Sequence, residues 1–299
     1  MIWMPAAPRP LQELTDVRLA RAGVRLLIKR EDRLHPIVSG NKWHKLKYNL
    51  EAAKAQEQRT LLSFGGAYSN HIHALAEAGA ACGFDTIGVI RGEPCERLNP
   101  TLQFAVERGM RLHYLSRADY RRKQNREIVE ALKVEFGDFY LIPEGGSNAL
   151  AVKGCREIVT DIDQPFDLIA TACGTGATLA GLVTGLTGDQ QALGFAVLKG
   201  AAFLRDEVVE LLKSATNSAY DNWSINLDYH FGGYAKTTPE LFQFIADFEA
   251  DHAIPLEPIY TGKMLYGLFD LIGRGVFRRG STIVAIHTGG LQGRGSMVN

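Results

Sequence analysis

The feature that most constrains this chain is a regular alternation of short apolar runs and amphipathic segments along nearly its whole length. Runs such as 25–29, 86–90 and 281–286 have the length of strands, and segments such as 41–55 have the length of helices. Continuous apolar strands separated by helices predict parallel sheets with helices on both faces. The sequence therefore predicts an α/β fold whose ligands bind at the carboxyl ends of the strands.

The pattern places the elements as follows. The expected strands are residues 25–29, 61–64, 86–90, 112–115, 139–142, 166–172, 193–198 and 281–286. The expected helices are residues 41–55, 69–82, 101–107, 119–136, 149–160, 204–215, 239–249 and 263–272, with one more opening after residue 178. The charge-rich helix 119–136 is interpreted as a solvated face.

Composition excludes several classes of protein. The chain has 299 residues, enough for about two domains, and 46% of them are apolar, so a disordered or disulfide-stapled chain is excluded. Lysine plus arginine equals aspartate plus glutamate, 33 each, so we expect no nucleic-acid partner. No apolar run is long enough to span a membrane, and the N-terminus lacks the pattern of a secretory signal. The four cysteines lack the spacing of a zinc site, so we expect no metal. We expect these cysteines to be reduced thiols in a cytoplasmic protein.

Glycine and hydroxyl residues concentrate at the strand-to-helix junctions, where backbone N–H groups and helix dipoles can hold an anion. These junctions are Ser39-Gly40-Asn41-Lys42, Gly65-Gly66-Ala67-Tyr68-Ser69-Asn70, Gly145-Gly146-Ser147-Asn148, Gly174-Thr175-Gly176-Ala177-Thr178 and His287-Thr288-Gly289-Gly290. The segment 174–178 is the best phosphate cradle, because it follows an apolar strand and opens an apolar helix. It has neither the lysine of a nucleotide P-loop nor the third glycine of a dinucleotide fingerprint. A tight turn without a ligand is the alternative.

Lys42 stands at the start of the expected helix 41–55, on the stripe formed by Leu46, Leu50 and Ala53. Desolvation and the positive end of the helix dipole both disfavour an ammonium there, so the amine is predicted to be a nucleophile or Schiff-base partner. The alternative is a lysine whose ammonium reaches water. Lys45 and Lys47 are interpreted as solvated.

Three further groups have a functional and a structural interpretation each. Ser69 is either a hydroxyl relay or the N-cap of its helix. Tyr260 is either a proton-transfer group or a core phenol. His71 and His73 form an HxH pair for which a metal is disfavoured, because no third ligand has a suitable spacing. Together, an activated lysine and a phosphate cradle on separate loops suggest pyridoxal phosphate.

The ordered motifs resemble the 1-aminocyclopropane-1-carboxylate (ACC) deaminase and D-cysteine desulfhydrase family. These are pyridoxal-phosphate enzymes with the tryptophan synthase β-like fold, called fold type II. The resemblance spans roughly residues 25–290 and is carried by segments 29–32, 39–42, 64–71, 142–148, 174–178, 260–263 and 287–290. It implies two parallel-sheet, three-layer αβα domains: a larger cofactor domain of residues 1–43 plus 151–299, and a smaller domain of residues 44–150 inserted into it. Members are commonly dimers, so a homodimer is expected.

The resemblance also implies roles for single residues. Lys42 would bind the cofactor covalently and move the Cα proton, and Asn70 would bind the 3′-oxygen of the cofactor. Gly174, Thr175, Gly176, Ala177 and Thr178 would bind its phosphate, and Thr261 and Thr288 would lie near its pyridine nitrogen. Ser69 and Tyr260 would act on a small amino-acid substrate. The substrate-binding residues would be Tyr68, Ser69, Asn70, His71 and Tyr260.

Departures from the family pattern bear on the substrate. ACC deaminases have glutamate and leucine where this chain has Thr261 and Thr288, so a desulfhydrase-like β-elimination giving pyruvate, ammonia and sulfide is the leading hypothesis. ACC deamination is the second hypothesis, and a protein that binds the cofactor or an amino acid without turnover is the third. A nicotinamide oxidoreductase is disfavoured by the missing fingerprint. Tyr68 and Ser39 also replace the usual glutamine and glycine, which puts D-cysteine itself in question.

Overall fold

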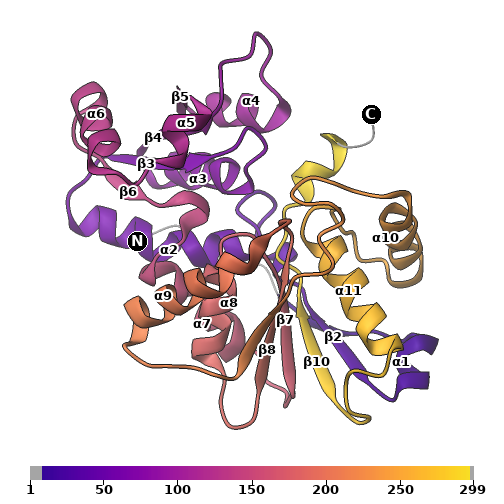
Figure 1. The fold of residues 1–299 in the computed structure, drawn as a ribbon. Helices are drawn as coiled ribbons and strands as arrows, with labels where there is room; N and C mark the ends of the chain where they lie inside the picture. Colours follow the sequence, from indigo (N-terminus) through magenta and orange to yellow (C-terminus); the bar gives the residue numbers. More distant parts are fainter. Residues whose placement is uncertain (1–8, 297–299) are drawn as a thin grey trace.

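The computed structural model describes residues 9–296 of the chain, arranged around two separate sheets (Figure 1). Residues 1–8, on which the expectation about a secretory signal rests, and residues 297–299 lie outside the described part. In that part, no helix is both long enough and apolar enough to cross a membrane.

The larger sheet has six strands in the order β1-β2-β10-β7-β8-β9. Strand β1 pairs antiparallel with β2, and every other neighbouring pair is parallel. The predicted parallel α/β architecture is therefore confirmed, with one short antiparallel edge strand added. The strands are β1 (Leu11–Glu13), β2 (Arg25–Lys29), β10 (Thr282–Ile286), β7 (Leu168–Cys173), β8 (Gln191–Ala196) and β9 (Trp223–Asn226).

The smaller sheet has four strands, all parallel, in the order β5-β4-β3-β6. Its strands come from one continuous stretch of chain and lie beside the larger sheet (Figure 1). They are β3 (Thr60–Gly65), β4 (Asp85–Arg91), β5 (Arg111–Leu115) and β6 (Tyr140–Ile142).

Helices cover both faces of each sheet, because each face has its own apolar core. On the larger sheet, one core includes α7 (Ala149–Thr160), α8 (Ala177–Gly185) and α9 (Leu204–Thr216), and the other includes α1 (Val17–Ala22), α10 (Pro239–His252) and α11 (Thr261–Gly273). On the smaller sheet, α2 (Asn41–Ala55), α3 (Asn70–Cys82) and α4 (Pro100–Glu107) share one core, and α5 (Arg117–Arg121) and α6 (Arg126–Phe136) contribute to the other. Both halves therefore have three layers.

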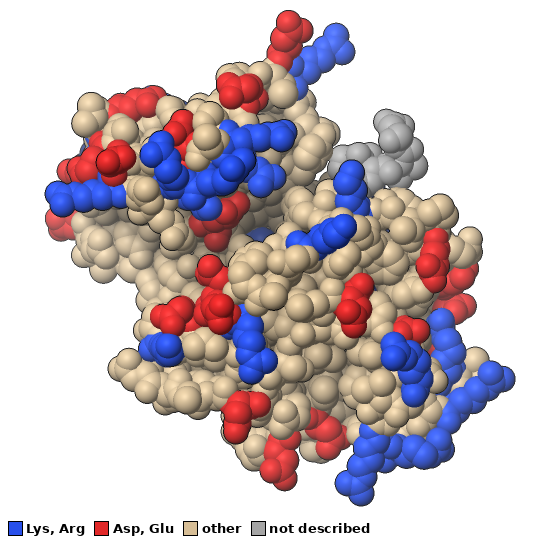
Figure 2. Space-filling model, viewed as in Figure 1, with Lys and Arg blue, Asp and Glu red and all other residues tan. Residues whose placement is uncertain are grey.

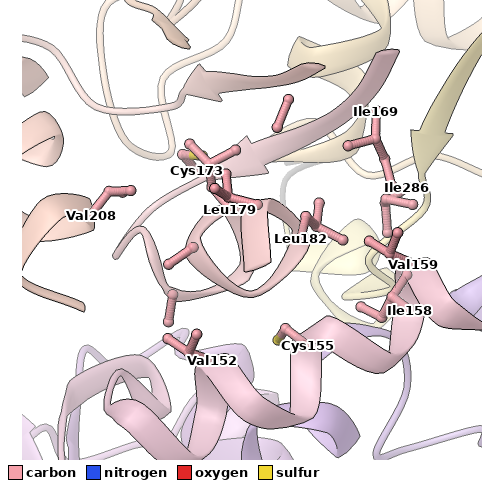
Figure 3. Close-up of a cluster of buried hydrophobic side chains, with 14 of the residues drawn as sticks. Val152, Cys155, Ile158, Val159, Ile169, Cys173, Leu179, Leu182, Val208 and Ile286 are labelled. Carbon is pink, nitrogen blue, oxygen red and sulfur yellow. The ribbon is translucent and has the colours of Figure 1, made fainter. Parts of the chain in front are cut away.

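Helices α7 and α8 pack against each other and against β7 in one core of the larger sheet. Val152 and Cys155 of α7 face Leu179 and Leu182 of α8 (Figure 3). Helix α2 lies against α7 at Gly154, where a Cβ atom would come within 1.8 Å of the His44 carbonyl oxygen. This close approach fixes α2, which belongs to the core of the smaller sheet, against the larger one.

Some elements differ from the sequence prediction. The expected helix 119–136 is two helices, α5 and α6, separated by a turn that ends at Asn125, the N-cap of α6. Tyr120 is buried there, so the segment is not wholly solvated. Elements β1, α1 and β9 were not predicted, because they are short or partly exposed and lack a continuous apolar run. The domain boundaries at residues 43 and 150 stay a proposal, which the separate sheets support.

Short 3₁₀ segments complete the described part of the chain. They are η1 (Glu31–Arg33), η2 (Glu144–Gly146), η3 (Ala201–Phe203) and η4 (Leu291–Ser296). In space-filling form the surface is hollowed between the two halves, and acidic and basic side chains are interspersed over both (Figure 2). The carboxyl ends of the strands of the two sheets feed the loops described next.

Candidate active site

The site begins where the chain enters helix α2 at Gly40. Gly40 has a φ of +60° and a ψ of −142°, a conformation that only glycine adopts readily. A Cβ atom on it would lie 1.9 Å from the carbonyl oxygen of Thr288. The backbone of the 287–290 loop therefore presses against the start of α2, which brings Lys42 beside the carboxyl end of β10.

Lys42 is partly exposed to solvent, yet protein atoms surround its amine. Burial, reinforced by the positive charge of Lys45, lowers the pKa of Lys42 to about 7. Its Nζ donates a 2.8 Å hydrogen bond to Asn41 Oδ1. The residues that share its helical stripe, Leu46 and Leu50, are fully buried. These contacts contradict a lysine whose ammonium extends into water.

The segment 174–178 holds a set of backbone donors without acceptors. In the described residues, none of its five N–H groups donates a hydrogen bond to another protein group. Gly176, the N-cap of α8, supplies no side-chain cap, so the positive end of that helix is open. Buried N–H groups rarely stay unpaired in native proteins, and a helix N-terminus favours an anion. The geometry thus fits a phosphate better than a turn without a ligand.

Helix α11 shows the contrast, because its N-terminus is already occupied by a protein carboxylate. The fully buried Glu257 accepts hydrogen bonds from the backbone N–H groups of Ile259, Tyr260 and Thr261 at 2.5–3.1 Å. It also accepts one from the Thr261 hydroxyl at 3.0 Å. Burial raises the pKa of Glu257, while these hydrogen bonds oppose that shift. No equivalent acid caps α8, so that helix end is open to an external anion.

Two neighbours of Lys42 connect it to this cradle. Asn41 Nδ2 donates to Thr178 Oγ1 at 2.8 Å, and Lys45 Nζ donates to Thr175 Oγ1 at 3.4 Å and to the Gly145 carbonyl at 3.0 Å. Lys45 is buried, and burial lowers its pKa, so its interpretation as a solvated lysine was wrong. Lys47 does lie nearer the surface, paired with Glu157. The Lys42 amine and the 174–178 segment therefore belong to one site.

Tyr260 lies against Gly174, the first residue of the cradle. A Cβ atom on Gly174 would come within 3.2 Å of Tyr260 Cε1 and 3.5 Å of its hydroxyl. Its ring meets the ring of Tyr234 edge to face at 6.0 Å. Burial, with Tyr234 and Glu257 adding to it, raises the pKa of Tyr260, so its phenol is protonated at neutral pH. A phenol pair at the edge of the cradle can carry a proton.

The smaller half contributes the start of helix α3. Ser69 is its N-cap and accepts from the Ile72 N–H at 3.3 Å, so the structural interpretation of Ser69 holds, while its hydroxyl proton stays available. The N–H groups of Asn70 and His71 donate to no protein group in the described residues. The Asn70 amide lies against Gly290, and Gln292 donates to its Oδ1 at 2.6 Å. Ser69 and Asn70 therefore reach the same junction as the loop after β10.

Other predicted residues lie elsewhere or act as supports. Tyr68 is 49% exposed, and in the described residues its side chain makes no hydrogen bond or ring contact. His71 is buried, with Nε2 at 2.9 Å from Ser63 Oγ, and burial together with Lys42 and Lys45 lowers its pKa well below the usual value. His73 instead stacks on Phe104, so the HxH pair is split between two environments. His287 is buried, with Nε2 at 2.6 Å from the Pro255 carbonyl.

Sequence reasoning missed three members of this site. Lys45 stands three residues after Lys42, a spacing that could have placed it on the same helix face. Glu257 precedes Tyr260 by three residues, a spacing typical of a carboxylate that caps a helix start. Tyr234 had no sequence signal, because it lies in an irregular loop and reaches Tyr260 only through the tertiary fold.

These features together define a class of enzyme. An amine whose pKa is lowered to about 7, a helix start with unpaired N–H groups and a second lysine beside it fit pyridoxal phosphate, which needs an amine for its aldehyde and donors for its phosphate. They lie at the carboxyl ends of parallel strands between two αβα halves. This is the arrangement of the fold type II pyridoxal-phosphate enzymes.

Comparison with known proteins places the chain in that class. Residues 2–289 match the model of the family described as pyridoxal-phosphate dependent enzyme, and the chain belongs to this family. It is 33% identical to a Pyrococcus horikoshii protein with the provisional name 1-aminocyclopropane-1-carboxylate deaminase, over 95% of this chain and 90% of that protein. It is 31% identical to the bifunctional D-cysteine desulfhydrase/1-aminocyclopropane-1-carboxylate deaminase of Arabidopsis thaliana, over 91% of this chain and 73% of that protein.

Solved structures agree with the fold. The crystal structure of an ACC deaminase homologue matches with a TM-score of 0.84 and 31% identity, covering 98% of this chain and 92% of that one. A hydrogen sulfide-producing enzyme of Fusobacterium nucleatum matches with a TM-score of 0.69 at 14% identity, which supports the fold alone. The predicted family, fold and cofactor are thus confirmed.

Proposed function

We propose that this enzyme catalyses β-elimination from a small amino acid, with D-cysteine as the substrate to test first. The observation that carries the cofactor chemistry underlying this proposal is the link from Lys42 through Asn41 to the 174–178 cradle, in two hydrogen bonds of 2.8 Å. It joins a nucleophilic amine to an anion site within one pocket.

The residues would divide the work as follows. The cradle and Lys45 hold the phosphate, and Lys42 provides the amine that binds the cofactor and then takes the proton from the substrate Cα. The free N–H groups of Asn70 and His71, with the Ser69 hydroxyl, bind the substrate carboxylate. The Asn70 side chain would contact the 3′-oxygen of the cofactor, and Thr261 and Thr288 would lie near its ring nitrogen.

When bound, pyridoxal phosphate supplies a conjugated ring that accepts the electrons released at Cα. A proton delivered to the departing sulfur would assist its release, and the Tyr260 phenol, which burial keeps protonated, is the proposed donor, with Tyr234 beside it. Overall, D-cysteine and water would give pyruvate, ammonia and hydrogen sulfide.

Thr261 and Thr288 favour this reaction over ACC deamination. A neutral hydroxyl near the pyridine nitrogen stabilises a carbanion less than a carboxylate does. Expulsion of a thiolate tolerates the weaker electron sink better than opening an unactivated cyclopropane. ACC deaminase remains the second candidate, and Glu257 favours it, because its carboxylate lies 3.0 Å behind the Thr261 hydroxyl.

The deciding experiment compares D-cysteine, L-cysteine and ACC on the purified enzyme loaded with pyridoxal phosphate. We expect pyruvate and sulfide in equal amounts from D-cysteine, with a kcat/KM well above that for ACC. Faster formation of 2-oxobutyrate from ACC would select the second candidate. Bound cofactor with no product from any of the three would favour a binding protein without turnover.

The Lys42→Ala variant tests the amine itself. The wild type should show a visible absorption band that borohydride abolishes, and the variant should not. The same band and the same borohydride response in both proteins would refute the assignment of Lys42.

We further propose a cytoplasmic homodimer that binds neither nucleic acid nor membranes. The balanced charge and the likeness to a dimeric family support this proposal. Light scattering on the purified protein measures the mass, and a monomer at working concentration would contradict it.

A further inference from the structure

The motif that begins at Tyr260 ends in a lysine to which the proposed function gives no role. Lys263 lies on α11, one helical turn after Tyr260, and its side chain is completely buried. A lysine is almost never fully buried unless its charge is paired or hydrogen-bonded. Its contacts must therefore repay a large desolvation cost.

Those contacts are two backbone carbonyls of one loop. Lys263 Nζ donates to the His230 oxygen at 2.9 Å and to the Gly233 oxygen at 2.8 Å. Both oxygens also close local turns, since Gly233 N–H donates to His230 and Lys236 N–H donates to Gly233. The ammonium therefore connects two consecutive turns, one closed at the His230 carbonyl and the next at the Gly233 carbonyl.

The loop needs such a support, because its backbone is strained. Phe231 and Ala235 have φ values of +52° and +55°, a region that costs a non-glycine residue about 1 kcal/mol. Gly232 and Gly233 also have positive φ values. Strained backbone of this kind persists only where the surrounding structure holds it.

The strained loop delivers one functional side chain. Tyr234 follows Gly233 directly and meets the Tyr260 ring at 6.0 Å. Tyr260 is the N-cap of α11, the helix that carries Lys263. Helix α11 therefore positions Tyr260 directly, and it positions Tyr234 through the contacts of Lys263 with the loop. The two phenols are thus fixed relative to each other by a single helix.

We propose that Lys263 is a positioning residue whose ammonium clamps the 230–236 loop and so holds Tyr234 against Tyr260. The effect on turnover rests on the proposed function, in which this phenol pair protonates the leaving group. The clamp itself does not depend on that function, and the two are tested separately.

Hydrogen exchange of the cofactor-free protein tests the clamp. In Lys263→Met, the amides of Gly233 and Lys236 should exchange at least about tenfold faster, while the strands of the larger sheet keep their protection. Lys213→Met, which removes a lysine that is 63% exposed, is the matched control and should leave the loop unchanged. Unchanged exchange in the 230–236 loop of Lys263→Met would overturn the clamp whatever the enzyme's substrate is. Should Lys263→Met not fold, Lys263→Gln, whose uncharged amide reaches one bond less far, is measured in the same way with the same expected result.

Steady-state kinetics on the loaded enzyme test the route through Tyr234. Misplacing the phenol should lower kcat about 100-fold with KM changed less than about threefold, because the clamp contacts no substrate. The double variant Lys263→Met/Tyr234→Phe should be no slower than the slower single variant. Losses that multiply, or a change confined to KM, would show that Lys263 does not act through Tyr234. A faster-exchanging loop in an enzyme that fails on D-cysteine would reject the proposed substrate and keep the clamp.

Discussion

Lys42 owes its chemistry to two neighbours of different kinds. Its burial disfavours the ammonium, and Lys45, three residues along the same helix, adds a like charge. Asn41 then fixes the amine by a hydrogen bond. The result is a pKa of about 7, so roughly half of the amine is neutral at physiological pH.

The electrostatic part of this arrangement gives the first prediction. Only the neutral amine attacks an aldehyde, so adduct formation by the cofactor-free enzyme should rise as the pH passes about 7. Removal of the like charge in Lys45→Met raises the pKa of Lys42, so the midpoint should move to higher pH, by on the order of one unit. Pyridoxal without phosphate is the probe, because Lys45 also contacts the phosphate cradle.

The midpoint is read from the borohydride-reducible absorbance at a series of pH values. Lys47→Met is the matched control, because its ammonium pairs with Glu157 instead, and its midpoint should equal that of the wild type. An unchanged or lower midpoint in Lys45→Met would contradict the role given to Lys45.

The sequence could predict residues whose chemistry is local. The apolar stripe and the helix start that mark Lys42 lie within its own segment, 41–55. The glycines of 174–178 directly follow an apolar strand in the sequence. Glu257 and Tyr234 matter through contacts made in space, since one caps a helix from inside the core and the other arrives on a strained loop. Lys45 was misjudged because the groups that accept its hydrogen bonds, Gly145 and Thr175, lie 100 and 130 residues further along the chain.

At the level of elements, the site is built from three helix N-termini that differ in the group that caps them. A carboxylate caps α11, a serine caps α3 and nothing caps α8. Periodicity predicted that these helices exist, because a continuous pattern needs no tertiary information. It could not predict the break between α5 and α6, where one amphipathic pattern continues across a turn.

The junction at Gly40 gives the second prediction. Gly40→Ala places a methyl group 1.9 Å from the Thr288 carbonyl in a backbone conformation foreign to alanine. We expect a loss of unfolding free energy of about 3 kcal/mol or more, measured by urea denaturation. The α2 start should separate from the 287–290 loop, so cofactor uptake should fall as well.

Gly83→Ala is the matched control for backbone strain alone. Gly83 also has a positive φ, +76°, but its Cβ would meet no atom within 4 Å. Its substitution should cost about 1 kcal/mol and leave cofactor uptake intact. Equal losses in the two variants would mean that the contact with Thr288 contributes nothing.

In the whole molecule, the pocket is shared between the two sheets. The cradle opens α8 on the larger sheet, Ser69 and Asn70 open α3 on the smaller one, and Lys42 lies on α2, which packs on both. The α/β class followed from the sequence because the alternation is nearly continuous. How the two halves meet did not, because it depends on close approaches such as Gly154 against His44, which no local pattern records.

A ligand that touches both halves should stabilise them together, and this is the third prediction. Pyridoxal phosphate at 100 times its dissociation constant contributes about 2.7 kcal/mol, which for a chain of this size raises Tm by about 5 °C. Hydrogen exchange should slow in α3 as well as in α8, because in the proposed site the ligand would contact the start of each helix. Inorganic phosphate occupies the cradle alone, so it should protect α8 and leave α3 unchanged. If the cofactor protected only the elements of the larger sheet, the smaller half would not take part in the site, and Ser69 and Asn70 would lose their assigned roles.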